Sequence, residues 1–138
     1  MADRVRKVNY CYVKVAGRAG QGASVLSTLR AEGVNLLAFS GFPAKGGKSQ
    51  LDLIPEDMTA LRRVARENGW RLSKVKKGFV ITGSDTVGAV QRHIDRLAGS
   101  RINITAADAV MAGKGRYGMI LWVKPKDYNR AARVLRAT

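Results

Sequence analysis

The chain has 138 residues, of which 46% are hydrophobic, so it can bury a core and is unlike an intrinsically disordered sequence. One cysteine and one histidine exclude an internal disulfide and disfavour a cysteine- or histidine-based metal site, so we expect neither a metal nor a cofactor. Basic residues outnumber acidic ones by 25 to 10, which gives a net charge of +15 and an attraction for polyanions. The excess is spread along the chain without a block of like charges, so a solvated basic surface is the simpler explanation.

No apolar stretch is long enough for a membrane-spanning helix, and the first residues lack the apolar segment of a secretory signal. The lone Cys11 lies in an apolar run, as expected of a small buried side chain. We therefore expect a cytoplasmic protein without membrane association.

The first half opens with an alternating run at 10–16 that is rich in β-formers and predicts a strand. Three glycines within 17–22 favour unusual backbone angles and predict a turn. Val25 and Leu29 then stand at helical spacing, and Gly33 ends the predicted helix.

Two apolar runs, at 35–42 and 49–54, flank a glycine-rich segment at 43–48, which predicts a hairpin. A second helix is predicted from the Pro55 to Asp57 region, and a fourth strand at 71–76. The expected order in the first half is therefore strand, helix, strand, strand, helix, strand.

The second half repeats the first. A shift of 68 residues aligns Gly20 with Gly88, and Val34-Asn35-Leu36 with Ile102-Asn103-Ile104. The same elements are accordingly expected from a strand at 78–82 onward, but the chain ends after the second helix of the copy. The second copy thus has no fourth strand of its own.

This order predicts an α+β fold of two tandem ferredoxin-like (βαββαβ) units, with two helices on one face of each antiparallel sheet. The first predicted domain is 1–77, including an N-terminal extension at 1–9, and the second is 78–138. The second sheet would end in an open edge, and proteins seldom leave such an edge uncovered. Either the alternating segment 4–8 covers it, or a second molecule pairs there in a homodimer.

The second copy carries a turn of the form Asp-x-x-Gly at Asp85 to Gly88, followed by a helix and by Ile102-Asn103-Ile104. This combination resembles the ACT domain, and the resemblance extends over both copies. In the first copy a glycine, Gly17, stands in place of the aspartate. ACT units typically bind an amino acid between paired units and pass the signal to an attached enzyme, so the resemblance implies a stand-alone regulatory protein of two tandem ACT units.

Elementary chemistry supports a site at these turns, because backbone N–H groups at a helix start favour a carboxylate. Asp85 is placed either to receive the ammonium group of an amino acid or to cap a helix that begins at Thr86. Asn35 and Asn103 either bond a ligand or close the turn. The predicted ligand-binding residues are Gly20, Gly22, Asn35, Leu36, Asp85, Gly88, Asn103 and Ile104.

Other functions receive less support. Arg63 and Arg66 correspond to Arg133 and Arg136, so RNA or DNA binding is the alternative, although no helix-turn-helix or zinc-finger spacing occurs. His93 fits a buried, hydrogen-bonded side chain better than a catalytic one. No serine has a partner that would make it a nucleophile, so we expect no catalytic residues and no enzymatic activity.

Overall fold

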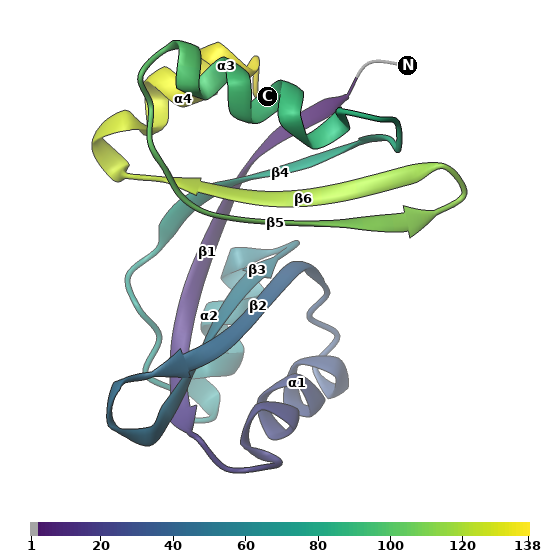
Figure 1. The fold of residues 1–138 in the computed structure, drawn as a ribbon. Coiled ribbons are helices and arrows are strands. Elements are labelled where there is room, and N and C mark those ends of the chain that lie inside the picture. The colour runs from purple at the N-terminus through teal and green to yellow at the C-terminus, as the bar shows by residue number, and fades with distance from the viewer. Residues whose placement is uncertain (1–2) are drawn as a thin grey trace. The chain divides into compact units, whose positions relative to one another are not determined.

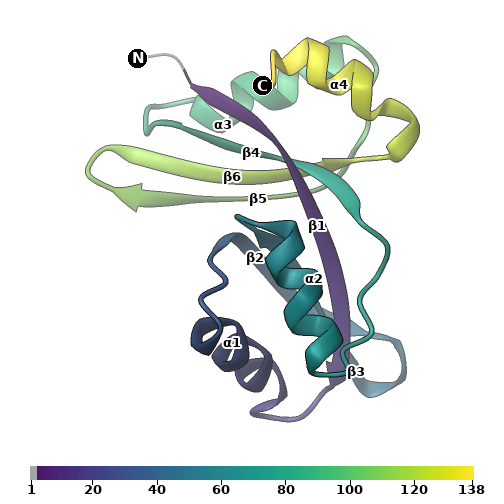
Figure 2. The same cartoon turned by 180° about the vertical axis from the view of Figure 1, so that it is seen from behind.

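The computed structural model describes residues 3–138, which form two compact units (Figures 1 and 2). The first unit is Asn9–Lys76, and the second unit is Lys77–Thr138 together with the residues up to Val8. The elements, in chain order, are β1 (Arg4–Ala16), α1 (Gln21–Ala31), β2 (Leu36–Ala44), β3 (Lys48–Pro55), α2 (Met58–Glu67), β4 (Lys76–Ser84), α3 (Ala89–Gly99), β5 (Ile104–Gly113), β6 (Arg116–Val123) and α4 (Tyr128–Leu135). Short 3-10 helices, η1 (Lys45–Gly47) and η2 (Pro125–Asp127), join β2 to β3 and lead into α4.

In the first unit, β3 lies between β2 and β1, and both pairs are antiparallel. Cys11 and Val13 of β1 stand opposite Leu53 and Leu51 of β3, so these four side chains share one face of the sheet. That face packs against α1 and α2, which Figure 2 shows in front of the strands. The alternation of apolar residues thus places the core of this unit between its sheet and its helices.

The predicted fourth strand of the first unit, at 71–76, is wrong. Residues 71–75 are not in a strand, and Lys76 is the first residue of β4. Ser73 explains the difference, because its N–H donates to the Tyr12 carbonyl and its hydroxyl accepts from the Tyr12 N–H, both at 2.9 Å. A side chain therefore takes over a bond that a strand would make with its backbone.

In the second unit the order of neighbouring strands is β1, β4, β6, β5. Phe79 of β4 stands opposite Leu121 of β6, and both are fully buried with Leu97 of α3 and Leu135 of α4. The ring of Tyr128 stacks on Phe79 with 4.6 Å between centroids. This core places α3 and α4 on one face of the sheet, as Figure 1 shows.

Of the two alternatives for the open edge, the one in which 4–8 covers it is confirmed, since these residues are the first part of β1, and β1 neighbours β4. Val5 enters the core of the second unit, and its carbonyl accepts from the N–H of Thr138 at 3.0 Å. The β4 edge that a homodimer was expected to use is therefore occupied by the chain itself. Residues 1 and 2 of the predicted N-terminal extension lie outside the described residues.

Residues 3–8 group with the second unit, whereas the sequence predicts a first domain at 1–77. The physical reason is that the strand β1 belongs to both units, and its first part contributes Val5 to the core of the second unit. Among residues 3–138, none of the helices has the length and apolarity needed to cross a bilayer.

Candidate ligand-binding site

The turn before α3 leaves the start of that helix open. Gly88 precedes the helix at φ 80°, a left-handed conformation that favours glycine, and no side chain caps the helix. Helix α3 begins at Ala89 rather than at Thr86, so the predicted capping role of Asp85 is wrong. The N–H of Ala89 donates to the Thr86 carbonyl at 3.0 Å. The N–H groups that follow in a first helical turn have no partner inside the helix, so they are available to an anion.

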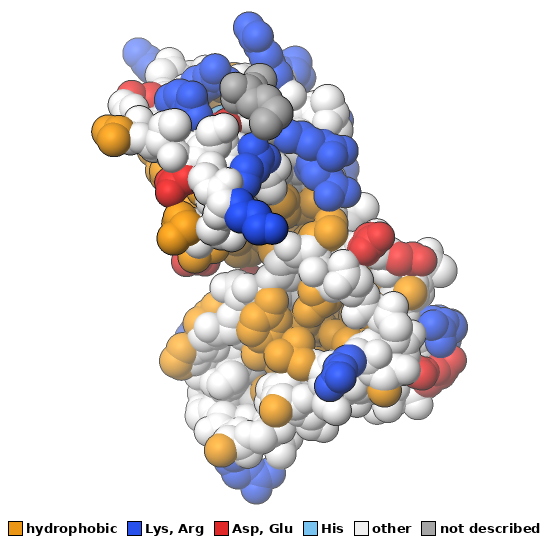
Figure 3. Space-filling view, turned by 90° about the vertical axis from the view of Figure 1, so that its right-hand side faces the viewer, with side chains coloured by type: hydrophobic (Ala, Val, Ile, Leu, Met, Phe, Trp, Pro, Cys, Tyr) orange, Lys and Arg blue, Asp and Glu red, His pale blue; other side chains and the backbone are white. Residues whose placement is uncertain are grey.

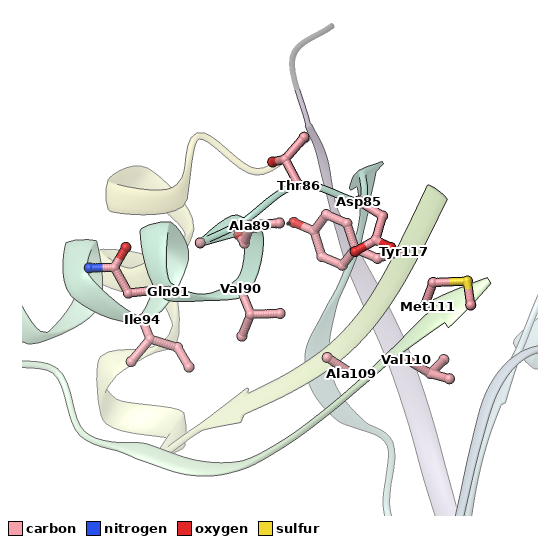
Figure 4. A pocket seen from close by; sticks show the side chains of 11 residues that line it. Asp85, Thr86, Ala89, Val90, Gln91, Ile94, Ala109, Val110, Met111 and Tyr117 are labelled. Atoms are coloured by element: carbon pink, nitrogen blue, oxygen red, sulfur yellow. Dashed lines mark hydrogen bonds between the residues drawn. The ribbon is translucent and has the colours of Figure 1, made fainter. Parts of the chain in front are cut away.

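A pocket of about 540 Å³ adjoins this turn (Figure 4). One wall comes from the turn and α3, and the other comes from the last part of β5 together with one residue of β6. The lining residues are Asp85, Thr86, Gly88, Ala89, Val90, Gln91, Ile94, Ala109, Val110, Met111 and Tyr117. Two residues that the sequence predicted, Asp85 and Gly88, thus belong to one concave site.

The pocket has a polar end and an apolar wall. Figure 4 shows Val90 and Ile94 pointing from α3 toward β5, where Val110 and Met111 are 69% and 61% exposed. At the turn, Asp85 is exposed, and no residue within 3–138 bonds to its carboxylate. The free carboxylate and the helix start form a charged end beside the apolar wall.

Tyr117 connects the pocket to a buried polar cluster. Its side chain lines the pocket, and its hydroxyl donates to Asp3 Oδ2 at 2.6 Å. His93 Nε2 lies 2.7 Å from the same oxygen, and Arg92 donates to it at 3.0 Å. His93 is only 3% exposed, as expected for a buried, hydrogen-bonded histidine. We call Asp3, Arg92, His93 and Tyr117 the Asp3 cluster.

Charge and burial act in opposite directions on the Asp3 cluster. Burial raises the pKa of Asp3, but hydrogen bonds from Tyr117 and His93 and the charge of Arg92 outweigh it, so the pKa lies below its ordinary value. Burial and the hydrogen bond to Asp3 raise the pKa of Tyr117 to about 12. Asp3 is therefore a carboxylate, and Tyr117 a neutral donor, at neutral pH.

The turn of the first unit has the same backbone anchor. The N–H of Gly17 donates to the Gly47 carbonyl at 2.8 Å, and the N–H of Asp85 donates to the Gly115 carbonyl at 2.8 Å. Gly20 precedes α1 at φ 91° without a side-chain cap. The two turns thus share their anchor, and each leaves a helix start without a side-chain cap.

The remaining predicted residues do not line the pocket at Asp85. Gly22 lies within α1 against Leu51, and the Asn35 amide donates to Glu56 Oε2 at 2.9 Å. Leu36 opens β2 and packs on the core of the first unit. Asn35 therefore ties the start of β2 to the residue after β3, as the turn-closing alternative predicted.

Asn103 is exposed immediately before β5, and Ile104 opens that strand against the core of the second unit. The pocket instead uses Ala109, Val110 and Met111, farther along the same strand. The site draws on β5 through these later residues.

A second hollow of about 470 Å³ lies in the first unit, along α1 and the end of α2. It contains none of the predicted site residues, and its lining is Ser27, Thr28, Ala31, Glu32, Glu67 and Asn68. Arg63 Nη1 lies 4.0 Å from Glu32 and 3.5 Å from Glu67. Its carboxylates therefore already have a cationic neighbour.

Sequence reasoning missed Asp3, Tyr117 and the apolar wall. Asp3 precedes every predicted element, so nothing local marks it as a partner of His93. Tyr117 and Val110 fit a strand pattern, and burial on a sheet face explains such residues without a site. A signal did exist in the isolated His93 on an apolar helix face, because a buried histidine needs a polar partner.

No family model matches the chain, and no curated protein matches it. Among solved structures, it is similar to protein BT0572 from Bacteroides thetaiotaomicron, with a TM-score of 0.81 and 15% identity over 96% of this chain and 88% of that one. It is also similar to the regulatory subunit of aspartate kinase from Thermus thermophilus, with a TM-score of 0.60 and 15% identity over 98% and 93% of the two chains. The corresponding subunit from Thermus flavus gives a TM-score of 0.57 and 17% identity over 98% and 94%. The chain therefore has an α+β fold similar to that of aspartate kinase regulatory subunits.

Proposed function

We propose that the protein is a regulatory module that binds a free amino acid in the pocket at Asp85 to Gly88. The observation that carries this proposal is the pocket itself, which places an unpaired carboxylate beside an uncapped helix start. Its structural neighbours include chains named as regulatory subunits, which supports a regulatory rather than a catalytic role. The absence of enzymatic activity stays a prediction.

The two charged groups of an amino acid match the two polar features of the pocket. Its α-carboxylate would accept from free N–H groups at the start of α3, where the helix dipole adds a favourable potential. Its ammonium group would pair with Asp85. Gln91 lines the same pocket, but its amide already donates to Asp95, so we assign it no direct role.

We also propose that the two units are two copies of one ACT-like unit. Gly20 and Gly88, aligned by the 68-residue shift, both precede the first helix of their unit in a left-handed conformation. The anchoring bonds from Gly17 to Gly47 and from Asp85 to Gly115 obey the same shift. These correspondences support a duplication more directly than the sequence pattern did.

As a regulatory module the chain would act on an enzyme carried by another chain. The neighbours from Thermus are named as subunits of aspartate kinase, which supports association with a kinase-type partner. The homodimer and the cytoplasmic location stay predictions, and the dimer needs an edge other than that of β4.

Thermal unfolding in the presence of each common amino acid tests the proposal. A ligand at about 100 times its Kd stabilises the native state by about 2.7 kcal/mol, which raises the Tm on the order of 5–10 °C. Asp85→Ala should abolish this rise. Asp108→Ala removes another exposed carboxylate of the second unit, on β5 but outside the pocket, and should leave the rise intact.

The same assay separates the nucleic-acid alternative. Figure 3 shows Lys and Arg side chains gathered on the second unit, an arrangement that attracts any polyanion. Phosphate contacts weaken steeply with salt, whereas binding of a zwitterion changes little. A Tm rise with oligonucleotides alone, lost at high salt, would replace the regulatory proposal by nucleic-acid binding.

A further inference from the structure

We propose that the ligand of the Asp85 pocket is an amino acid with an uncharged aliphatic side chain of about the size of valine or leucine. This inference rests on the proposed function and names the class of ligand. The basis of the inference is the apolar wall of the pocket, which the α-amino and α-carboxylate groups of the ligand would not contact.

The apolar wall beside the charged end is made of hydrocarbon groups. Val90 and Ile94 of α3 point toward β5 (Figure 4). Ala109 and Met111 of β5 stand opposite the core residues Met119 and Tyr117, so their side chains lie on the same face of the sheet as α3. Met111 is one of the few large apolar side chains of the described chain that remain well exposed. An aliphatic side chain packed against this wall would remove apolar surface from water, which is favourable for both molecules.

The charges of the pocket disfavour the other amino acids. Asp85 is the only charged side chain among the lining residues of this pocket, and its carboxylate would already be paired with the ammonium group of the ligand. A lysine or arginine ligand would then place a second cation against the apolar wall without a counter-charge, and an aspartate or glutamate ligand would place an anion there. Burying an unpaired charge costs more free energy than the contact returns.

The polar end argues for a zwitterion rather than for a second copy of the chain. A contact between two copies would cover the apolar wall, but it would leave both Asp85 and the N–H groups at the start of α3 without complementary charges. A free amino acid satisfies these groups and the wall together.

Isothermal titration calorimetry with a homologous series tests the inference on the wild-type chain. Glycine, alanine, 2-aminobutyrate, norvaline and leucine share the charged groups and differ only in hydrocarbon. Each added methylene that is buried should lower the Kd about fourfold. Lysine and aspartate should bind more weakly than alanine.

A charge in the wall provides the matched variant. Met111→Asp should weaken leucine binding at least tenfold, because the new carboxylate must lose water to admit the side chain. The control is Phe42→Asp, which introduces the same carboxylate at an exposed apolar residue of β2 in the first unit. Phe42→Asp should leave the Kd for leucine unchanged, and circular dichroism should show both variants folded.

The outcomes separate the two proposals. Asp85-dependent binding of lysine or aspartate, with no gain along the aliphatic series, overturns the inference and leaves the regulatory proposal standing. Failure of every amino acid to bind overturns both. If Met111→Asp changes only the mass measured by light scattering, the wall is a self-association surface and the inference is wrong.

Discussion

The two glycine-rich turns have the same backbone anchor but differ in the side chain for which they have room. In each, a backbone N–H donates to the carbonyl of a hairpin glycine at 2.8 Å, and the next helix begins without a side-chain cap. A Cβ at Gly17 would overlap the carbonyl oxygen of Gly47, so the first unit has no room for a side chain there. The aligned position in the second unit holds Asp85, which lines a pocket.

The second unit also holds a polar cluster that the first lacks. The positions aligned with His93 and Tyr117 by the 68-residue shift are Val25 and Ser49. Val25 is buried in an apolar core, whereas His93 and Tyr117 share the carboxylate of Asp3. The two turns share a backbone anchor, but the close approach of Gly17 to Gly47 leaves no room in the first unit for a side chain such as that of Asp85.

Exchanging the aspartate and the glycine between the turns gives the largest expected effect. Gly17→Asp should destabilise the first unit by about 2–3 kcal/mol, because the new side chain collides with backbone that must move. Asp85→Gly removes an exposed, unpaired side chain and should cost less than about 1 kcal/mol while abolishing ligand binding.

Urea unfolding followed by tryptophan fluorescence distinguishes these effects, since Trp70 reports on the first unit and Trp122 on the second. Trp70→Phe and Trp122→Phe backgrounds isolate each signal. Equal losses of stability from the two exchanges would contradict the steric account of Gly17.

The next largest loss of stability is expected from removing the Asp3 carboxylate, which belongs to the polar cluster that the first unit lacks. Asp3→Ala deprives Tyr117, His93 and Arg92 of their common acceptor and should cost the second unit about 2 kcal/mol. Gly83→Ala should have a similar effect, because a Cβ there would overlap the Asp3 carboxylate. The unfolding curve of the first unit serves as the internal control, and a shift in both curves would refute the assignment to one unit.

The buried acids of the two units should respond to pH with opposite signs. The lowered pKa of Asp3 means that its stabilisation is fully present above the unfolded pKa near 4 and is lost as the pH falls through its folded value. Burial raises the pKa of Asp52 in the first unit, although a hydrogen bond from Gln50 and the charge of Lys76 partly oppose this. Its contribution is present below the unfolded pKa and is lost as the pH rises through the folded value.

At pH 7 we therefore expect Asp3→Asn to lower the Tm and Asp52→Asn to raise it. The asparagine at position 52 keeps an acceptor for Gln50. Thermal unfolding between pH 3 and pH 7 measures both, and the differences from wild type should shrink below about pH 4. A loss of stability at neutral pH from Asp52→Asn would contradict this expectation. It would show that the interactions of the Asp52 carboxylate contribute more free energy than its burial costs.

The smallest expected effect concerns Asn35 and Asn103, for which the sequence predicts the same alternative roles. Asn35→Ala breaks the bond to Glu56 and should cost the first unit about 0.5–1 kcal/mol. Asn103 is exposed, so Asn103→Ala should change stability by less than about 0.5 kcal/mol. Urea unfolding with the same tryptophan backgrounds measures both, and a larger loss at Asn103 would give that residue an unrecognised structural role.

Most elements of the fold follow from local pattern. Apolar side chains at helical spacing placed Leu29 and Leu97 in helices, and alternation placed Val13 in a strand with its side chain in the core. Glycines marked the turns correctly, since Gly20 and Gly88 both have positive φ. The prediction of a strand at 71–76 is wrong because Ser73 bonds with Tyr12, a residue 61 positions away, which no local window of sequence contains.

The sequence by itself determined the helices, the hairpins, the two glycine-rich turns and the candidate role of Asp85, because these depend on residues within a few positions of one another. Only the tertiary structure decided that residues 4–8 lie beside β4, that Asp3 meets His93 and Tyr117, and that α3 and β5 line one pocket. Such contacts join segments separated by many residues, and many registers would satisfy the same local preferences. Packing selects among those registers, since only one of them buries the apolar faces while giving each buried charge a partner.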